Sequence, residues 1–305
     1  MTTSSRPSAS GFRKAALVGV VAALGVGLVA TPAFAKPPKP HPVPTDDGTV
    51  VAFGLNNPRG IAIRSHNRLW VAEGGTGGTE CTSDVSHVCF GLTGSLTLIK
   101  DADKNGKKKK SSTVQRIVTG LLSVSSNGGA EVVGLDGLTM RGDHEVYGVM
   151  AESTDDLSAE LLKVTSPSAE LTAAVTDYAG RLVRFRRLEP TKKKKTELSV
   201  VANVGTFNWA WTGTNSSLDP GGQFPDANPY DVAASGNRQW VVDAGANTVV
   251  EVRKHKGTIE QRVLAYIPNT PLSDAVPTCI ARKGNYLYVG TLAFADNFGG
   301  GTPVS

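Results

Sequence analysis

The sequence contains few of the residue types that usually carry catalysis or bind transition metals. Its 305 residues include three cysteines and five histidines, and the histidines fall in turns or in a proline-rich segment. There is no Gly-x-Ser-x-Gly elbow and no paired-histidine motif, so neither a serine hydrolase nor a histidine-based metalloenzyme is indicated. The motifs therefore leave open whether the chain is an enzyme.

Long apolar segments are equally scarce. Ala15–Ala30 is the longest, and it is shorter than the roughly 20 residues that a transmembrane helix needs. Basic residues precede it and Thr31-Pro32-Ala33-Phe34-Ala35 follows it, which is the order found in secretory signal peptides. We expect residues 1–35 to be a signal peptide cleaved after Ala35, no transmembrane segment after it, and a secreted, extracellular protein.

A marked excess of positive charge is also missing once the signal peptide is set aside. The chain has 32 basic and 27 acidic residues, and the signal takes three basic residues and no acidic one, which leaves 29 − 27 = +2. Nucleic-acid binding is therefore not expected. We expect residues 36–48 to be a proline-rich spacer and residues 49–305 to form one domain.

The few cysteines suit an oxidising compartment. Cys81 and Cys89 are eight positions apart, and this spacing predicts a disulfide that closes a small loop. Metal binding by this pair is the weaker interpretation because no second cysteine pair exists and His87 alone does not complete a ligand set. Cys279 lies in an apolar run and is expected to be a buried, inert thiol.

An internal repeat is the main positive feature of the sequence. NPRGIAIRSHNRLWVAEGG from Asn57 recurs in altered form from Gly134, Asn228 and Val276, and Pro229 and Pro277 lie 48 positions apart. Period-two alternation with Gly and Asn turns predicts strands, and four-stranded units at this spacing predict an all-β β-propeller. The predicted strands are 59–63, 68–73, 94–99 and 114–119; 135–140, 145–150, 180–186 and 197–204; 229–234, 239–243, 247–252 and 259–267; and, in an incomplete fourth unit, 277–281 and 286–292.

Two families share these motifs. The NPYDVAA and WVVDAGAN segments of the third unit resemble the NHL repeat of six-bladed propellers. GLNNPRGIAI, LWVAEGGTGG, VVDAGANTVVEV and VPTCIA with LYVGTL resemble the ScyD/ScyE family of secreted bacterial proteins over nearly all of 49–292. The resemblance implies further blades beyond four, so we expect an open arc with unpaired edges, including a D-type strand at 49–55.

Polar residues at the ends of the two inner strands of each unit are the candidate site. In propeller lactonases and related hydrolases, carboxylates and amides at such positions bind a metal in the central funnel, where hard oxygen ligands suit calcium-like ions. Asp243 and the neighbouring Asn247 have an alternative interpretation as turn-fastening residues that bond nearby backbone amides. The candidates for the funnel are Asn57, Glu73, Glu152, Asn228 and Asp243.

Two insertions fall on the same face as these residues. Segment 205–228 is expected to be a loop, and its Trp209 and Trp211 either form a platform for a sugar or a flat ring or pack down over a blade. Segment 153–177 is expected to hold one or two short helices that cap the funnel.

Runs of lysine are expected on the opposite face of the propeller. Asp101, Asp103 and Asn105 match the opening of a calcium loop, but Ser112 stands where a bidentate Glu belongs, which favours a plain hairpin turn. The lysine runs at 104–110, 191–195 and 254–256 suit either solvated turns or contact with an anionic cell-wall polymer.

These observations favour a secreted β-propeller that acts as an extracellular binding or scaffold protein for a small molecule or saccharide. A metal-dependent hydrolase, lactonase or lyase with its site in the funnel is the first alternative. A cell-surface adhesin that uses the basic face is the second.

Overall fold

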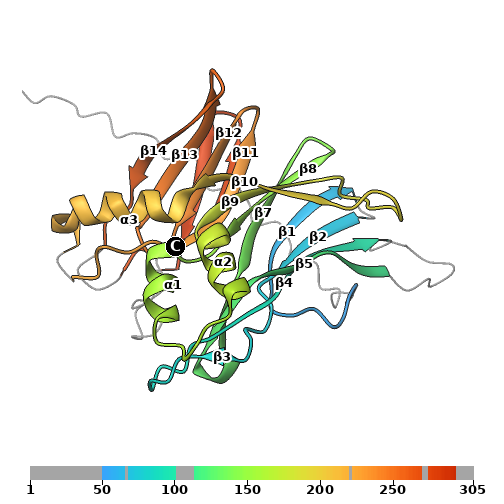
Figure 1. The fold of residues 1–305 in the computed structure, drawn as a ribbon. Coiled ribbons are helices and arrows are strands. Elements are labelled where there is room, and N and C mark those ends of the chain that lie inside the picture. The colour runs from blue at the N-terminus through green and yellow to red at the C-terminus, as the bar shows by residue number, and fades with distance from the viewer. Residues whose placement is uncertain (1–49, 66–67, 101–112, 220–221, 270–273, 293–305) are drawn as a thin grey trace, which may run out of the picture. The chain divides into compact units, whose positions relative to one another are not determined.

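A computed structural model describes residues 50–65, 68–100, 113–219, 222–269 and 274–292 of the chain. Within these ranges the chain is an all-β protein whose strands are gathered into successive antiparallel sheets (Figure 1). The strands are β1 (Pro58–Ser65), β2 (Arg68–Glu73), β3 (Glu80–Cys81), β4 (Cys89–Lys100), β5 (Thr113–Ser126), β6 (Glu131–Val133), β7 (Leu135–Arg141), β8 (Glu145–Met150), β9 (Arg181–Arg186), β10 (Glu197–Asn203), β11 (Pro229–Ser235), β12 (Arg238–Asp243), β13 (Thr248–His255), β14 (Thr258–Tyr266), β15 (Pro277–Lys283) and β16 (Tyr286–Thr291).

Each predicted unit forms one sheet in chain order. β1-β2-β4-β5 make the first sheet, to which the short strands β3 and β6 add; β7-β8-β9-β10 make the second, β11-β12-β13-β14 the third, and β15 pairs with β16. The order is that of β-propeller blades, in which each strand pairs with the next. The prediction of these strands is confirmed, with ends that differ by at most three residues except where β4 begins five residues earlier and β5 ends seven residues later than predicted. Only β3 and β6 were missed, because they are too short to show a period.

Residues of both faces are buried on the inner strands of the second and third sheets, which have a neighbouring sheet on either side. On β12, Val241 belongs to the cluster between the second and third sheets, with Val149 and Leu182. Its neighbours Trp240 and Val242 belong to the next cluster, with Ile280 of β15. This explains why the strands read as nearly continuous apolar runs.

The first strands of the four sheets lie side by side. A β-carbon added to Gly60 of β1 would lie 2.4 Å from the Asp136 carbonyl oxygen of β7, and one added to Gly137 would lie 2.4 Å from Cα of Asp231 in β11. The Ile280 N–H of β15 donates a hydrogen bond to the Asp231 carboxylate at 2.9 Å. Glycine is thus required where neighbouring inner strands touch through their backbones.

In the described ranges three α-helices occupy connections between strands (Figure 1), together with two short 3-10 helices at Asn127–Gly129 and Ser216–Leu218. α1 (Thr154–Leu161) and α2 (Ala169–Tyr178) confirm the prediction for 153–177, and the hydroxyls of Ser153 and Ser168 cap them. The prediction of a loop at 205–228 is wrong over its first half, where α3 (Val204–Thr214) forms with Asn203 as its cap. Glycines and β-branched residues disfavour a helix here, and α3 is held by hydrogen bonds from the buried Asn208 amide to Asp243 and from the buried Thr212 hydroxyl to the Asp226 carbonyl.

Two further predictions are wrong. Val50–Leu55 is not a strand. Its Gly54 carbonyl accepts a hydrogen bond from Arg116, and the N–H of the following Asn56 donates to Glu73, so side chains of the first sheet hold this segment. The Cys279 thiol is exposed and not buried, because alternation along β15 turns it away from Ile280 and the core.

The Cys81–Cys89 disulfide is present as predicted. No helix in the described ranges is long and apolar enough to cross a membrane. The predicted signal peptide, the spacer and the calcium-loop residues Asp101, Asp103 and Asn105 lie outside the described residues.

Candidate functional site

A pocket of about 690 Å³ opens between the inner strands of the sheets. The starts of β1, β7, β11 and β15 line it, and we call it the inner pocket. In every one of these strands the pairing with the next strand is irregular just after the first residue, as at Pro58, Leu135, Pro229 and Pro277. Such bulges redirect side chains at equivalent positions of the repeat. The charged, phenolic and thiol side chains of the inner pocket are Arg59, Asp136, Tyr230, Asp231, Cys279 and Arg282, and Thr139 and Thr278 add hydroxyl groups.

Asp136 is the most unusual of these residues. Its side chain is 1% exposed, and neither carboxyl oxygen accepts a hydrogen bond of ordinary geometry from the residues that the structure describes. Arg59 Nε lies 3.7 Å from Oδ1. Burial raises the pKa of Asp136 to about 7, and the Arg59 charge and the Gly134 backbone only partly oppose this rise. A buried carboxyl of this kind is able to accept or to donate a hydrogen bond near neutral pH.

Arg59 and Asp231 are held in fixed positions around it. Arg59 donates to the Val132 carbonyl through Nη2 and to the Tyr230 hydroxyl through Nη1, at 3.3 Å for the latter. Asp231 accepts from the Val232 and Ile280 backbone N–H groups at 2.8 and 2.9 Å. The wall of the inner pocket is therefore preorganised, while the Asp136 carboxyl still has unused hydrogen-bonding capacity.

A second, smaller pocket of about 280 Å³ is rich in carboxyl groups and is here called the acidic pocket. Glu152, Asp156 and Asp226 line it together with Glu131 and Glu160. Glu152 has a left-handed backbone (φ 62°), and no group of the described residues donates a hydrogen bond to its carboxyl. Burial, then the nearby Asp156 and Asp226 charges, raise the pKa of Glu152 to about 8.

Asp243 and Asn228 are bonded to each other and to their own turns. Asp243 Oδ1 accepts from the N–H groups of Asn228 and Ala246 at 2.7 and 2.9 Å, and Oδ2 accepts from the buried Asn208 Nδ2 at 2.6 Å. Asn228 Oδ1 accepts from the Glu152 N–H at 3.1 Å. Burial raises the pKa of Asp243 to about 6 against the effect of these bonds.

Asn247 fastens the same turn from its other end. Its left-handed backbone (φ 53°) closes the connection between β12 and β13. Its side-chain amide donates to Asn269 and Asp274, and its oxygen accepts from the Val276 N–H at 2.9 Å. These contacts connect the third sheet to the segment that leads into β15.

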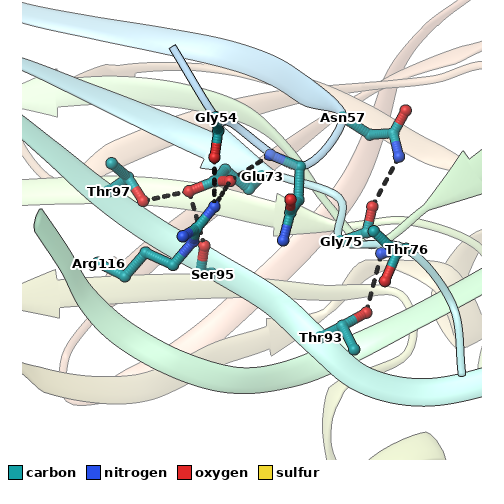
Figure 2. Close-up of polar contacts among 10 residues, drawn as sticks. Gly54, Asn57, Glu73, Gly75, Thr76, Thr93, Ser95, Thr97 and Arg116 are labelled. Atoms are coloured by element: carbon teal, nitrogen blue, oxygen red, sulfur yellow. Dashed lines mark hydrogen bonds and ion pairs between the residues drawn. The ribbon is translucent and has the colours of Figure 1, made fainter. Parts of the chain in front are cut away.

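Glu73 lies in a separate polar network in the first sheet (Figure 2). Its carboxylate is fully buried and accepts from Arg116 Nη2 at 2.8 Å, from Ser95 at 3.0 Å, and from Thr97 and the Asn56 N–H. Burial would raise the pKa of Glu73, but Arg116 and the other donors hold it below its usual value.

Asn57 lies near this network but makes a different contact. Its amide donates to the Gly75 carbonyl at 2.7 Å (Figure 2), and its own carbonyl accepts from the Gly74 N–H at 3.0 Å. Asn57 thus closes the turn between β2 and the disulfide hairpin.

The two tryptophans of the predicted platform lie on α3 and are half-buried. Trp211 stacks at a tilt on Tyr266 of β14, with ring centroids 5.9 Å apart, and Phe224 approaches the same tyrosine edge-on at 6.5 Å. Trp211 and Phe224 therefore pack against the outer strand of the third sheet.

The structure thus groups the predicted residues in two places. Hydrogen bonds join Glu152, Asn228 and Asp243, whereas Glu73 and Asn57 belong to the first sheet. The inner pocket was not among the sites predicted from the sequence. Its residues follow directly after the first residue of each repeat unit, so the repeat alignment was the signal that could have found them.

Known proteins with detectable similarity to this chain are found among solved structures. The chain matches no protein-family model and no curated protein sequence. Among solved structures it is similar to a PQQ-bound aldose sugar dehydrogenase from Streptomyces coelicolor, with 13% identity, a TM-score of 0.33 and coverage of 84% of this chain and 93% of that chain. It is also similar to a putative oxidoreductase (glucose dehydrogenase) from Thermus thermophilus, with 12% identity, a TM-score of 0.31 and coverage of 83% and 95%. At these TM-scores the likeness assigns no activity to this chain.

Proposed function

We propose that the chain is a secreted, ScyD/ScyE-like β-propeller that binds a small polyhydroxylated molecule, of the saccharide class, in the inner pocket. The observation that carries this proposal is the Asp136 carboxyl, which is buried at the pocket wall beside Arg59 and accepts no hydrogen bond of ordinary geometry from the described residues. The order of basic, apolar and small residues in 1–35 supports secretion, as does the disulfide.

The chemistry of the pocket suits hydroxyl groups. A sugar hydroxyl both donates and accepts, so it is able to donate a hydrogen bond to the Asp136 carboxylate and to accept one from a neighbouring guanidinium. A buried acceptor without a partner costs about 1–3 kcal/mol, and a ligand hydroxyl would recover part of that cost. Both carboxyl oxygens of Asp136 are covered in this structure, so the ligand reaches them when the partly exposed Arg59 side chain beside them moves aside. The volume of about 690 Å³ lies in the range of small-molecule sites, and the Tyr230 ring offers an apolar face.

Binding is tested by isothermal titration calorimetry against a panel of neutral mono- and disaccharides, with glucose, galactose and maltose as first probes. We expect saturable binding that Asp136→Asn weakens at least tenfold, because an amide cannot accept at both positions. Asp143→Asn is the matched control, since Asp143 lies in an exposed turn. Absence of binding across the panel, or equal binding by both variants, contradicts the proposal.

A metal-dependent hydrolase or lyase is the second candidate, and the Glu152 carboxyl in the acidic pocket favours it. The other predicted ligands fit a calcium-like ion less well. Both oxygens of Asp243 and the side-chain oxygen of Asn228 already accept hydrogen bonds from the protein. Metal analysis after dialysis distinguishes the two candidates: stoichiometric calcium that is lost in Glu152→Gln favours the enzyme, and metal-free protein favours the binding function.

The adhesin alternative rests on the lysine turns. Lys192–Lys195 are exposed in the connection between β9 and β10. Contact with an anionic cell-wall polymer through these residues would weaken steeply with salt. Charge reversal at Lys192–Lys195 that leaves polymer binding unchanged would contradict it.

A further inference from the structure

The hairpin loop between β3 and β4 brings three potential metal ligands together. One ligand atom each of Cys81, His87 and Cys89 lies within 4.8 Å of the others. We propose that reduction of the Cys81–Cys89 disulfide converts this loop into a site for a thiophilic divalent cation of the Zn²⁺ type. The proposal is independent of the inner pocket and of its ligand.

The loop has contacts that hold its shape without the disulfide. Cys81 and Cys89 are cross-strand partners in the β3–β4 pairing, and Cys89 is also paired with Ser125 of β5. Inside the loop the Thr82 N–H donates to the Val88 carbonyl at 2.8 Å, and the Val88 N–H donates back to Thr82 Oγ1 at 3.0 Å. The two sulfurs should therefore stay next to each other after reduction.

The loop is also fastened to the neighbouring connection. Thr82 forms an isolated bridge with Val164, and the Ser83 N–H donates to the Lys163 carbonyl at 3.2 Å. Asp84 accepts from Thr82 Oγ1 at 2.8 Å and from Ser86, and it pairs with Lys163 Nζ at 3.4 Å. Asp84 is thus engaged in holding the loop.

His87 is placed to complete the site. Its backbone is left-handed (φ 45°), its N–H donates to the Asp84 carbonyl at 3.3 Å, and its side chain is exposed. Its carbonyl oxygen lies 3.7 Å from Cys89 Sγ, so the loop folds back over the sulfurs. Two thiolates and one imidazole form a ligand set that zinc and cobalt prefer, with water as a fourth ligand.

A small-molecule dithiol delivers two electrons and two protons to the disulfide, which becomes two thiols while the dithiol becomes a disulfide. Metal binding then releases the two thiol protons, because the thiolate is the ligand. The disulfide and the metal site exclude each other, so the metal stabilises the reduced form by mass action.

The test uses the secreted chain, residues 36–305, with Cys279→Ser so that Cys81 and Cys89 supply the only thiols. The protein is reduced with dithiothreitol, freed of reductant under argon and titrated with Co²⁺, whose thiolate charge-transfer and d–d bands report sulfur ligation and tetrahedral geometry. We expect one equivalent to bind to reduced protein, to be displaced by Zn²⁺, and not to bind to oxidised protein.

The variant that tests the imidazole is His87→Ala, with His144→Ala in the β7–β8 turn as its control. We expect His87→Ala to weaken binding at least tenfold and to change the d–d bands, and His144→Ala to change neither. Far-UV circular dichroism follows the fold of the reduced protein. The proposal is overturned if the reduced protein unfolds, binds no Co²⁺, or binds it as tightly with His87→Ala as without.

Discussion

Replacement of Asp243 distinguishes a turn-fastening residue from a ligand of the site. Asp243 is fully buried, and its two oxygens accept from three donors: the N–H groups of Asn228 and Ala246 and the amide of Asn208. Asp243→Ala leaves all three donors buried without a partner. At about 1 kcal/mol for each donor, the expected loss in the free energy of unfolding is about 3 kcal/mol.

Asp243→Asn should cost much less, about 1 kcal/mol or under. The new amide keeps one oxygen for the two backbone donors, and its nitrogen needs an acceptor. Asn208 supplies that acceptor if its side-chain amide turns over, because its other contact is the Thr248 hydroxyl, which is able to donate or accept. The substitution also removes a charge whose burial raises the pKa of Asp243 to about 6.

The assay is urea unfolding at pH 7, followed by tryptophan fluorescence, on the wild type and both variants. We expect midpoints in the order wild type, Asp243→Asn, Asp243→Ala, with both variants binding saccharide normally. Equal losses for the two variants would refute the reasoning about Asn208. An alanine variant with wild-type stability but no ligand binding would refute the assignment of Asp243 as a turn-fastening residue.

Three further substitutions test other parts of the account. Gly137→Ala should lower the free energy of unfolding by about 3 kcal/mol in the same assay, because the added carbon would overlap the Asp231 backbone, and a loss below about 0.5 kcal/mol would contradict the close approach of the inner strands. The pKa of the Glu152 carboxyl is raised from 4.5 to about 8, so the folded state favours the protonated carboxyl, and this stabilisation is fully present below pH 4.5 and is lost as the pH rises through about 8. Melting temperatures measured by calorimetry between pH 5 and 8.5 should therefore fall less in Glu152→Gln than in the wild type. An unchanged dependence of melting temperature on pH would contradict the burial of this group. Glu73→Ala should destabilise by about 3 kcal/mol, since it leaves the Asn56 N–H and the Ser95 and Thr97 hydroxyls without their acceptor, while the partly exposed Arg116 keeps its bond to the Gly54 carbonyl. Saccharide affinity measured by calorimetry on the folded protein should not change, and a selective loss of affinity would place Glu73 in the binding site.

The architecture was predictable because it depends on repetition. Each blade repeats the same alternation of apolar residues and the same Gly or Asn turns, so the boundaries of β7, β12 and β16 follow within a few residues. The capped helices α1 and α2 were also predictable, since Ser153 and Ser168 stand directly before them. α3 was not, because its stability comes from contacts with distant residues such as Asp243.

The candidate site was predictable only in part. Glu152, Asn228 and Asp243 were singled out from their positions at strand ends, and they do lie close together. The sequence could not show that the oxygens of Asp243 and Asn228 are already engaged, because their partners include Asn208, on a segment predicted to be a loop. Nor could it show that Asp136 is buried beside Arg59, since the two residues are distant in sequence and meet only when β1 packs on β7.

Protection of the Cys279 thiol tests the central claim most directly. Cys279 lines the inner pocket, and Cys81 and Cys89 are joined in the disulfide, so it is the single free thiol of the oxidised chain. The rate of its reaction with an aromatic disulfide reagent reports access to the pocket. We predict that a saccharide which binds in calorimetry slows this reaction in proportion to its occupancy, and that Asp136→Asn abolishes the protection. A saccharide that binds while Cys279 reacts at its full rate would contradict the placement of the ligand in the inner pocket.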